Sequence, residues 1–196
     1  MKPEILRQYP LVKKFFDQVR DMGLDTAPEA AKAQARAIEL IAAEGGGSKE
    51  EKEASMIVAA LMLDPTSLYL DIGRFWVGYN EEVENAVQGL ISTAPGSFMT
   101  PTIAQATAAS GIAQLEGVAE KLRAGKPLDG TPQEVLDSAK QAFGQEMEVF
   151  SYLDAPALLA RYETIRTGVF AALEEKIQPA QPPKRPAKPG NGSFDL

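Results

Sequence analysis

Met56-Ile-Val-Ala-Ala-Leu-Met-Leu63 is the stretch that decides the fold, because it is apolar on every side. A helix at a protein surface carries its apolar residues on one stripe, whereas a helix that is apolar all round is surrounded by other elements. The stretch is also much shorter than the roughly 20 apolar residues that are needed to cross a bilayer. It therefore predicts a central helix in a helical bundle, and no membrane span.

Helical spacing marks the segments that follow this stretch. From about Asp154 to Lys176, apolar residues recur at intervals of three and four, as they do on one face of an amphipathic helix. Residues 136–150 and 112–122 carry similar stripes, and residues 104–111 (AQATAASG) are small enough to let another helix approach closely. No stretch alternates long enough to indicate a strand. The sequence therefore predicts an all-α fold, a compact bundle of seven or eight helices.

Start and stop signals divide the chain into these helices. A capping box pairs a hydroxyl group at the N-cap with a glutamate three residues later. The candidates are Ser48 with Glu51, Thr131 with Glu134 and, less ideally, Thr26 with Glu29, while Thr100 and Asn80 are further N-caps. Helix ends are predicted at Gly45-Gly-Gly47, at Pro95-Gly96 and at Gly125, which Pro127 follows. The three consecutive glycines lack the spacing of a phosphate-binding loop and are interpreted as a linker.

Two segments differ from the bundle in composition. Residues 65–79 are the most aromatic part of the chain, and they predict a loop or short helix packed on the central helix. Trp76 is interpreted there as a core anchor, with a platform for stacking a ligand as the alternative. Residues 178–196 are rich in proline and poor in apolar side chains, which predicts a disordered tail. The expected organisation is a helical domain, 1–177, followed by this Pro-rich tail.

The chain contains no histidine and no cysteine. Histidine is the usual general base and the commonest metal ligand, and cysteine supplies thiolates and disulfides. Their absence excludes a histidine-assisted triad, a zinc site of ordinary type and a CxxC redox pair. We therefore expect no metal and no cofactor, and the composition weighs against catalysis.

The net charge of −7 is unevenly distributed. Lys184, Arg185 and Lys188 make the tail basic, whereas the rest of the chain holds 17 basic and 26 acidic side chains. So acidic a surface repels a phosphate backbone, which disfavours binding to nucleic acid. The N-terminal residues have no uninterrupted apolar segment of the kind that a secretory signal contains, and this favours a cytoplasmic location.

Three stretches carry a family resemblance: ARAIELIAA (35–43), IVAALMLD (57–64) and IGRFWVGYNEEVENAVQGL (72–90). Residues 30–92 resemble the HD-type hydrolase domain of the RelA/SpoT stringent-response enzymes, which hydrolyse (p)ppGpp. The first stretch is similar to the family's helix with the first metal-binding histidine, and the second to the helix that ends in the His-Asp doublet. The third is similar to the segment in which a phenylalanine-glycine turn precedes a helix.

This chain departs from the family at the residues that bind metal. The doublet position reads Leu63-Asp64, the first histidine falls near Ala33, and no position matches the family's later aspartate. A lone Asp64 cannot replace a set of histidine and aspartate ligands. The resemblance therefore implies a degenerate HD-like scaffold without the hydrolase. Asp64, which Pro65 follows, is also explained as the end of the central helix.

Carboxylates, lysines, hydroxyl groups and the backbone remain for chemistry, and a pair of carboxylates is the acid–base arrangement to consider. A glycosidase-like pair needs two carboxyl groups about 5–10 Å apart, one of them in a dry environment. Asp64 and Asp71 are candidates for such a pair, whereas Glu146 and Glu148 are predicted to be solvated. The glutamates of 50–53 and 81–84 are explained by the dipole of the helix that each begins. The candidate binding residues are Asp64, Tyr69, Asp71, Trp76 and Tyr79.

The sequence favours a non-catalytic binding or regulatory module that acts through protein or small-ligand contacts. Its expected working surfaces are residues 101–124, residues 68–79 and the tail. One alternative is a structural, self-assembling subunit of a larger complex, in which the stripe of 158–177 or the small-residue face forms a homo-oligomer. A carboxylate-dependent phosphohydrolase is a further, less favoured alternative.

Overall fold

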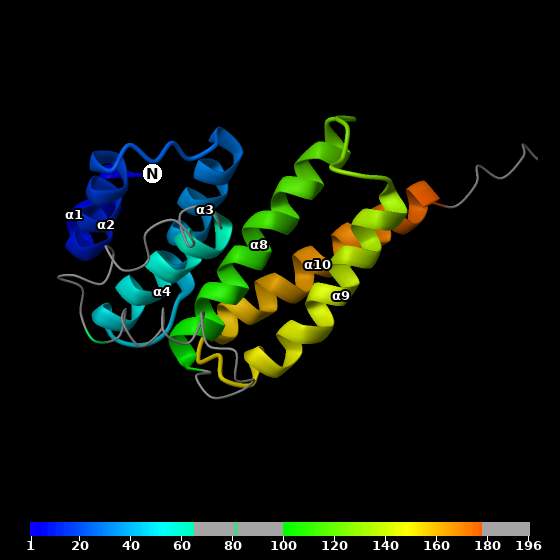
Figure 1. The fold of residues 1–196 in the computed structure, drawn as a ribbon. Coiled ribbons are helices and arrows are strands. Elements are labelled where there is room, and N and C mark those ends of the chain that lie inside the picture. Colours follow the sequence, from blue (N-terminus) through cyan, green and yellow to red (C-terminus); the bar gives the residue numbers. More distant parts are fainter. Residues whose placement is uncertain (65–80, 82–99, 178–196) are drawn as a thin grey trace, which may run out of the picture.

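The computed structural model describes residues 1–64, 81 and 100–177, with the backbone alone for 143–148. All regular secondary structure in this part of the chain is helical, which confirms the predicted all-α fold (Figure 1). The described helices are α1 (Pro3–Gln8), α2 (Pro10–Asp21), α3 (Pro28–Glu44), α4 (Lys49–Leu63), α8 (Pro101–Arg123), α9 (Pro132–Phe150) and α10 (Pro156–Ile177). The aromatic segment 65–79 and the tail 178–196 lie outside the described residues.

Proline starts every one of these helices except α4. At the first helical position proline loses nothing, because its missing N–H would have no partner within the helix and its fixed φ suits the helix. Two of the three predicted capping boxes are confirmed. The N–H of Glu51 donates to Ser48 Oγ over 3.2 Å and the N–H of Ser48 to Glu51 over 2.6 Å. Thr131 and Glu134 bond in the same reciprocal way, and Thr100 Oγ1 accepts the N–H of Ile103.

The N-cap predicted at Thr26 was wrong. Helix α3 begins at Pro28, and its N-cap is Ala27, which makes no side-chain capping bond. Ala27 has the extended backbone conformation (ψ 140°) that proline imposes on the residue before it. Ala27 therefore cannot form the first turn, and the helix starts one residue later than the capping box requires. Asn80, the other predicted N-cap, lies outside the described residues.

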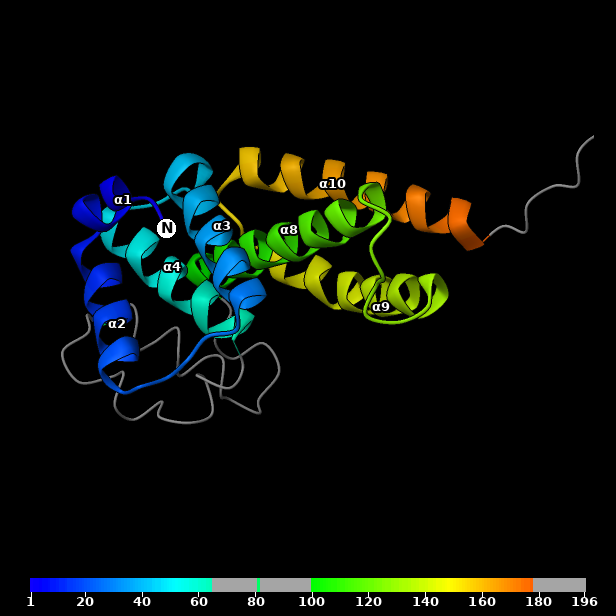
Figure 2. The ribbon, with the colours of Figure 1, turned by 90° about the horizontal axis from the view of Figure 1, so that it is seen from above.

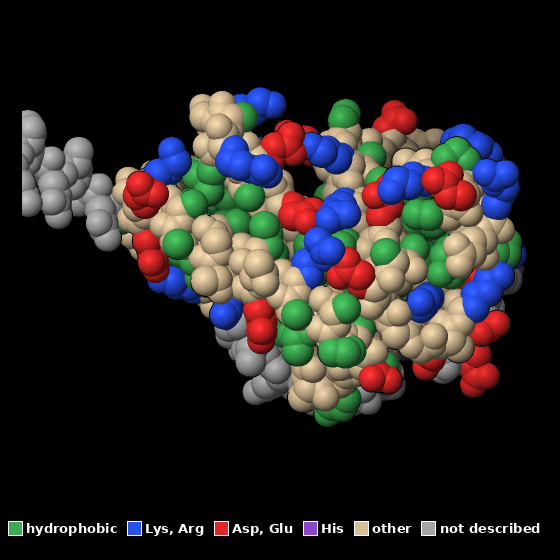
Figure 3. All heavy atoms as spheres, turned by 180° about the vertical axis from the view of Figure 1, so that it is seen from behind, with side chains coloured by type: hydrophobic (Ala, Val, Ile, Leu, Met, Phe, Trp, Pro, Cys, Tyr) green, Lys and Arg blue, Asp and Glu red, His purple; other side chains and the backbone are tan. Residues whose placement is uncertain are grey.

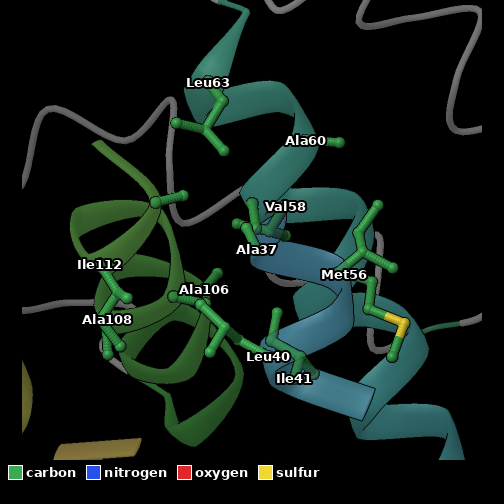
Figure 4. Close-up of a cluster of buried hydrophobic side chains, with 14 of the residues drawn as sticks. Ala37, Leu40, Ile41, Met56, Val58, Ala60, Leu63, Ala106, Ala108 and Ile112 are labelled. Carbon is green, nitrogen blue, oxygen red and sulfur yellow. The ribbon is translucent and has the colours of Figure 1, made fainter. Parts of the chain in front are cut away.

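Helices α4 and α8 form the buried centre of the described structure. Every residue from 56 to 61 is at most 1% exposed, which confirms the predicted central helix. Every residue from 102 to 113 of α8 is also buried, because its small side chains let α3, α4 and α10 pack closely against it. Figure 4 shows residues of α3, α4 and α8 in one hydrophobic cluster, among them Ile41, Val58 and Ala106.

Helices α8, α9 and α10 extend together away from the N-terminal helices (Figure 2). The stripe of α10 faces inward, with Leu158, Tyr162, Val169 and Leu173 buried. The small-residue face of α8 and these residues of α10 are thus buried within the chain. Among the described helices, none has both the length and the apolar composition of a membrane-spanning segment.

The glycines at 45–47 are a packed junction rather than a plain linker. The N–H of Gly46 donates to Oε1 of Gln105 on α8 over 2.7 Å, and Nε2 of Gln105 donates to Oγ of Ser55 on α4 over 3.0 Å. A Cβ atom at Gly46 would collide with the carbonyl oxygen of Asp154, which precedes α10. Glycine is therefore required where the α3–α4 connection meets the start of α10.

Glu53 has a different role from the one predicted. The sequence placed it among the glutamates that complement the dipole of their own helix, but it is buried, with 6% exposure. Its Oε1 accepts the N–H of Leu11, in the first turn of α2, over 2.9 Å. Helix α2 has no side-chain cap of its own, and the preceding Pro10 has no N–H to donate. A carboxylate of α4 therefore caps α2 and fixes the N-terminal helices to the core.

Candidate binding site between α8, α9 and α10

A pocket of about 390 Å³ lies between α8, α9, α10 and the connection from α8 to α9. We call it the three-helix pocket. Apolar side chains and glycine make up most of its lining: Gly111, Leu115, Val118, Leu128, Val135, Ala139, Ala142, Tyr162 and Phe170. The polar lining residues are Gln114, Lys121, Asp129, Glu134, Ser138 and Arg166. A concave site of this size, with apolar walls and a few polar groups, is typical of small-molecule sites.

The packing of α8 on α10 closes the pocket at one end. A Cβ at Gly111 would lie 2.6 Å from the ring of Tyr162, so glycine allows the two helices to approach there. The Tyr162 ring packs edge-on against Phe150, with centroids 4.8 Å apart. Beyond this contact, the described α9 residues that line the pocket include three small ones, Ser138, Ala139 and Ala142, besides Glu134 and Val135. The short side chains leave the space between the three helices unfilled.

Lys121 lies at the end of the pocket where α8 leads into α9. Its Nζ lies 2.7 Å from a carboxylate oxygen of Asp129 and 3.9 Å from one of Glu29. The hydrogen bond to Asp129 raises the pKa of Lys121. The Lys121 side chain is 22% exposed, whereas that of Asp129 is 88% exposed. Of this pair, the cation lies against the apolar wall and the carboxylate lies in solvent.

Arg166 is the other half-buried ionisable side chain in the lining, and its guanidinium lies 5.9 Å from the centre of the Phe170 ring. This distance is within the range of a cation–π contact. Glu134 is exposed and accepts both the N–H and the hydroxyl of Thr131, and the backbone bond lowers its pKa. Among the described lining residues, the charged side chains that are half-buried are therefore the cations Lys121 and Arg166.

Of the predicted binding residues, only Asp64 belongs to the described part of the chain, and it does not line this pocket. Asp64 is the C-cap of α4, where its N–H donates to the carbonyl of Ala60 over 3.2 Å, which confirms that it ends the central helix. Tyr69, Asp71, Trp76 and Tyr79 lie outside the described residues. Nowhere in the described ranges do three histidine, cysteine or acidic side chains gather as a metal site requires.

The resemblance to an HD-type hydrolase domain stays a prediction. Ala33, where the family has a metal-binding histidine, lies half-buried on α3. The next residue, Gln34, is buried and donates through Nε2 to the carbonyl of Ala60 over 2.9 Å. An amide hydrogen bond therefore joins α3 to α4 near the position of the family's doublet. Comparison with protein-family models, with curated proteins and with solved structures gives no match for this chain.

Sequence reasoning missed the three-helix pocket, although it placed Ala139 and Phe170 on the correct stripes. An apolar stripe predicts which face of a helix is buried, but it does not show whether the space that the face borders is filled. Small side chains at 138, 139 and 142 opposite large ones at 162 and 170 were the available signal. Figure 3 shows hydrophobic side chains on the surface toward the end of α10, with charged side chains around them.

Proposed function

We propose that this chain is a non-catalytic binding module and that it holds a small ligand in the three-helix pocket. The observation that carries the proposal is the pocket itself, about 390 Å³ between α8, α9 and α10 with largely apolar walls. A well-packed three-helix unit fills this space with side chains, because protein interiors are close-packed. Burial of an apolar ligand against these walls provides the favourable free energy of binding.

The polar groups of the pocket support binding rather than catalysis. The carboxylate of Asp129 is held by Lys121, and the carboxylate of Glu134 is held by the first turn of α9. Both carboxylates are exposed and have structural partners, so neither is placed as a buried acid or base. The ionisable side chains of the site are therefore better placed to orient a bound ligand than to transfer a proton.

The scaffold is the second part of the proposal. A degenerate HD-like origin is supported by the packing of α3 on α4, which brings the helices of Ala33 and Asp64 together. On such a scaffold the loss of the metal site leaves a helical unit that responds to a ligand or a protein partner. We propose a regulatory role for that response.

A probe of the pocket tests the proposal directly. We expect the neutral fluorophore N-phenyl-1-naphthylamine to bind saturably at one site, with a blue shift of its emission. Ala139→Phe places a ring in the pocket and is expected to weaken binding about tenfold or more. Gln141→Phe is the matched control, because residue 141 is exposed on the same helix. Absence of saturable binding, or equal binding by the two variants, contradicts the proposal.

A further inference from the structure

We infer that the last residues of the chain, Ser193-Phe-Asp-Leu196, dock into the three-helix pocket and compete there with a bound ligand. This inference rests on the proposed function and assigns the regulation of that same site. In this arrangement the tail occupies the pocket until a ligand displaces it, so that binding of the ligand releases the tail.

The pocket leaves apolar surface in contact with solvent. Its half-buried apolar lining residues come from α8, from the connection that follows α8, from α9 and from α10: Val118, Leu128, Val135, Ala139 and Phe170. Figure 3 shows hydrophobic side chains on the surface toward the end of α10, the helix that residue 178 follows. Apolar surface that water can reach gains free energy when another apolar group covers it.

The end of the tail supplies apolar groups that can cover this surface. Phe194 and Leu196 are the only large apolar side chains after Ile177, and the other tail residues are proline, alanine, glycine or polar. A phenylalanine ring carries a large apolar area, and a pocket of about 390 Å³ has the size that holds a small molecule. The residues of the tail that gain most from the pocket are therefore its last four.

The length of the tail allows this contact. Tyr162 and Phe170 line the pocket 15 and 7 residues before Ile177, which is about 22 and 10 Å along the helix axis. Sixteen residues, 178–193, separate Ile177 from Phe194, and an extended chain of that length spans about 50 Å. Attachment to α10 also gives the end of the tail an effective concentration in the millimolar range, so a weak contact is enough to fill the pocket.

Opposite net charges favour contact between the tail and the helical domain. The tail carries Lys184, Arg185 and Lys188 against Asp195, whereas residues 1–177 hold 17 basic and 26 acidic side chains. This attraction keeps the tail close to the surface of the domain, and solvent and salt screen it at longer range. The apolar contact then decides where on that surface the end of the tail docks.

Fluorophore binding by full-length tail variants tests the inference. We expect the double variant Phe194→Ser, Leu196→Ser to bind N-phenyl-1-naphthylamine about fivefold or more tightly than the unmodified chain, because a site that is occupied most of the time loses apparent affinity in proportion. The gain should stay constant over about a hundredfold range of protein concentration, as docking within one chain requires. The matched control, Gln181→Ser with Ala187→Ser, removes no large apolar side chain and should keep the affinity of the unmodified chain.

A fluorine label on the ring of Phe194 reports the position of the tail directly. The fluorine resonance of the full-length chain should shift when N-phenyl-1-naphthylamine is added, because the ring leaves the pocket. Ala139→Phe fills the pocket and should shift the resonance in the same direction. Gln141→Phe, at an exposed position of the same helix, should leave the resonance in place.

Each contrary outcome overturns a specific statement. Equal affinity in the unmodified chain and the double variant, or an equal gain in the control, overturns docking by residues 193–196 while the pocket still binds the fluorophore. A gain that increases with protein concentration overturns docking within one chain, because it indicates the tail of a second copy. A resonance that responds to neither the fluorophore nor Ala139→Phe places the Phe194 ring outside the pocket. Only the absence of saturable binding by the unmodified chain contradicts the proposed function itself.

Discussion

The two halves of α8 serve different purposes within one helix. From 102 to 113 every residue is buried and small side chains predominate, so neighbouring helices lie close. From 114 to 123 only Leu115 is buried, and the helix is held through ion pairs. Arg36 of α3 binds Glu116 through two hydrogen bonds of 2.6 and 2.8 Å, and Lys32 pairs with Glu120. The first half joins the core and the second half lines a pocket.

This difference shows how a small bundle can combine stability with an open site. Close packing in the first half removes apolar surface from water and provides much of the free energy of folding. The second half can then leave space unfilled without loss of the fold. Substitutions in the core and in the pocket wall should therefore have different, and in one case opposite, effects on the free energy of unfolding.

The largest expected difference is between Ile41 in the core and Val118 in the pocket wall. Ile41 is fully buried against α4 and α8, so Ile41→Ala should lower the free energy of unfolding by about 2–5 kcal/mol. Val118 borders space that is already empty, so Val118→Ala should cost about 1 kcal/mol or less. Urea unfolding followed by circular dichroism measures both values, and equal costs would show that the core and the pocket wall are packed alike.

Two glutamines of α8 give the next comparison. Gln105 is buried and bonds both Gly46 and Ser55. Gln105→Ala leaves the N–H of Gly46 without its acceptor, at an expected cost of about 1–3 kcal/mol. Gln114 is exposed at the pocket, and Gln114→Ala should change stability by about 0.5 kcal/mol or less. The same urea titrations apply. If Gln114→Ala lowers the free energy of unfolding as much as Gln105→Ala does, the two halves of α8 do not differ in packing.

Two glycines of α8 should differ in the sign of the effect. Gly111→Ala places a methyl group against the Tyr162 ring and should destabilise the fold by about 1–2 kcal/mol. Nothing lies within 4 Å of a Cβ at Gly117, so Gly117→Ala should stabilise it by about 0.5–1 kcal/mol through the better helix propensity of alanine. Thermal unfolding separates the two variants. Destabilisation by Gly117→Ala would indicate an unrecognised contact at that position.

Local sequence signals predicted the helices well, because each depends on a few neighbouring residues. The hydroxyl–glutamate pairs at 48/51 and 131/134 and the all-apolar run from 56 to 63 specify their own environment. The failures involve residues whose partners are distant in sequence. Glu53 caps a helix that begins some 40 residues earlier, and Gly46 is fixed by Gln105 and by the backbone at Asp154. The roles of Glu53 and Gly46 depend on contacts between helices that are distant in the sequence, and the spacing of residues along one helix does not reveal such contacts.

The candidate site could not be predicted for the same reason. The three-helix pocket is the space that remains when α9 and α10 pack on α8, and its volume depends on the distances between helices. Arg166 and Phe170 lie four residues apart in the sequence, which predicts a shared face but not that this face borders a pocket. Four of the five predicted binding residues lie outside the described residues, and their roles stay predictions.

The smallest expected effect concerns the start of α9, which lines the pocket together with the second half of α8. The backbone bond from Thr131 lowers the pKa of Glu134 in the folded chain. A carboxylate with a depressed pKa adds stability above its unfolded pKa of about 4.3, and this contribution is lost as the pH falls through the folded pKa. Glu134→Gln should therefore lower the melting temperature slightly at pH 7, and the gap to the unmodified chain should close below about pH 4.

The pH dependence is what distinguishes this capping effect from a loss of packing. Thermal melts of both proteins across the acid range measure the gap, and an NMR titration of the Glu134 carboxyl group measures its pKa. A gap of constant size from neutral to acid pH would contradict the capping role, because a protonated glutamate and a glutamine should then be equivalent. Asp137, exposed one turn further along α9, provides the control variant Asp137→Asn. This variant removes one carboxylate from α9 at a position outside the capping box.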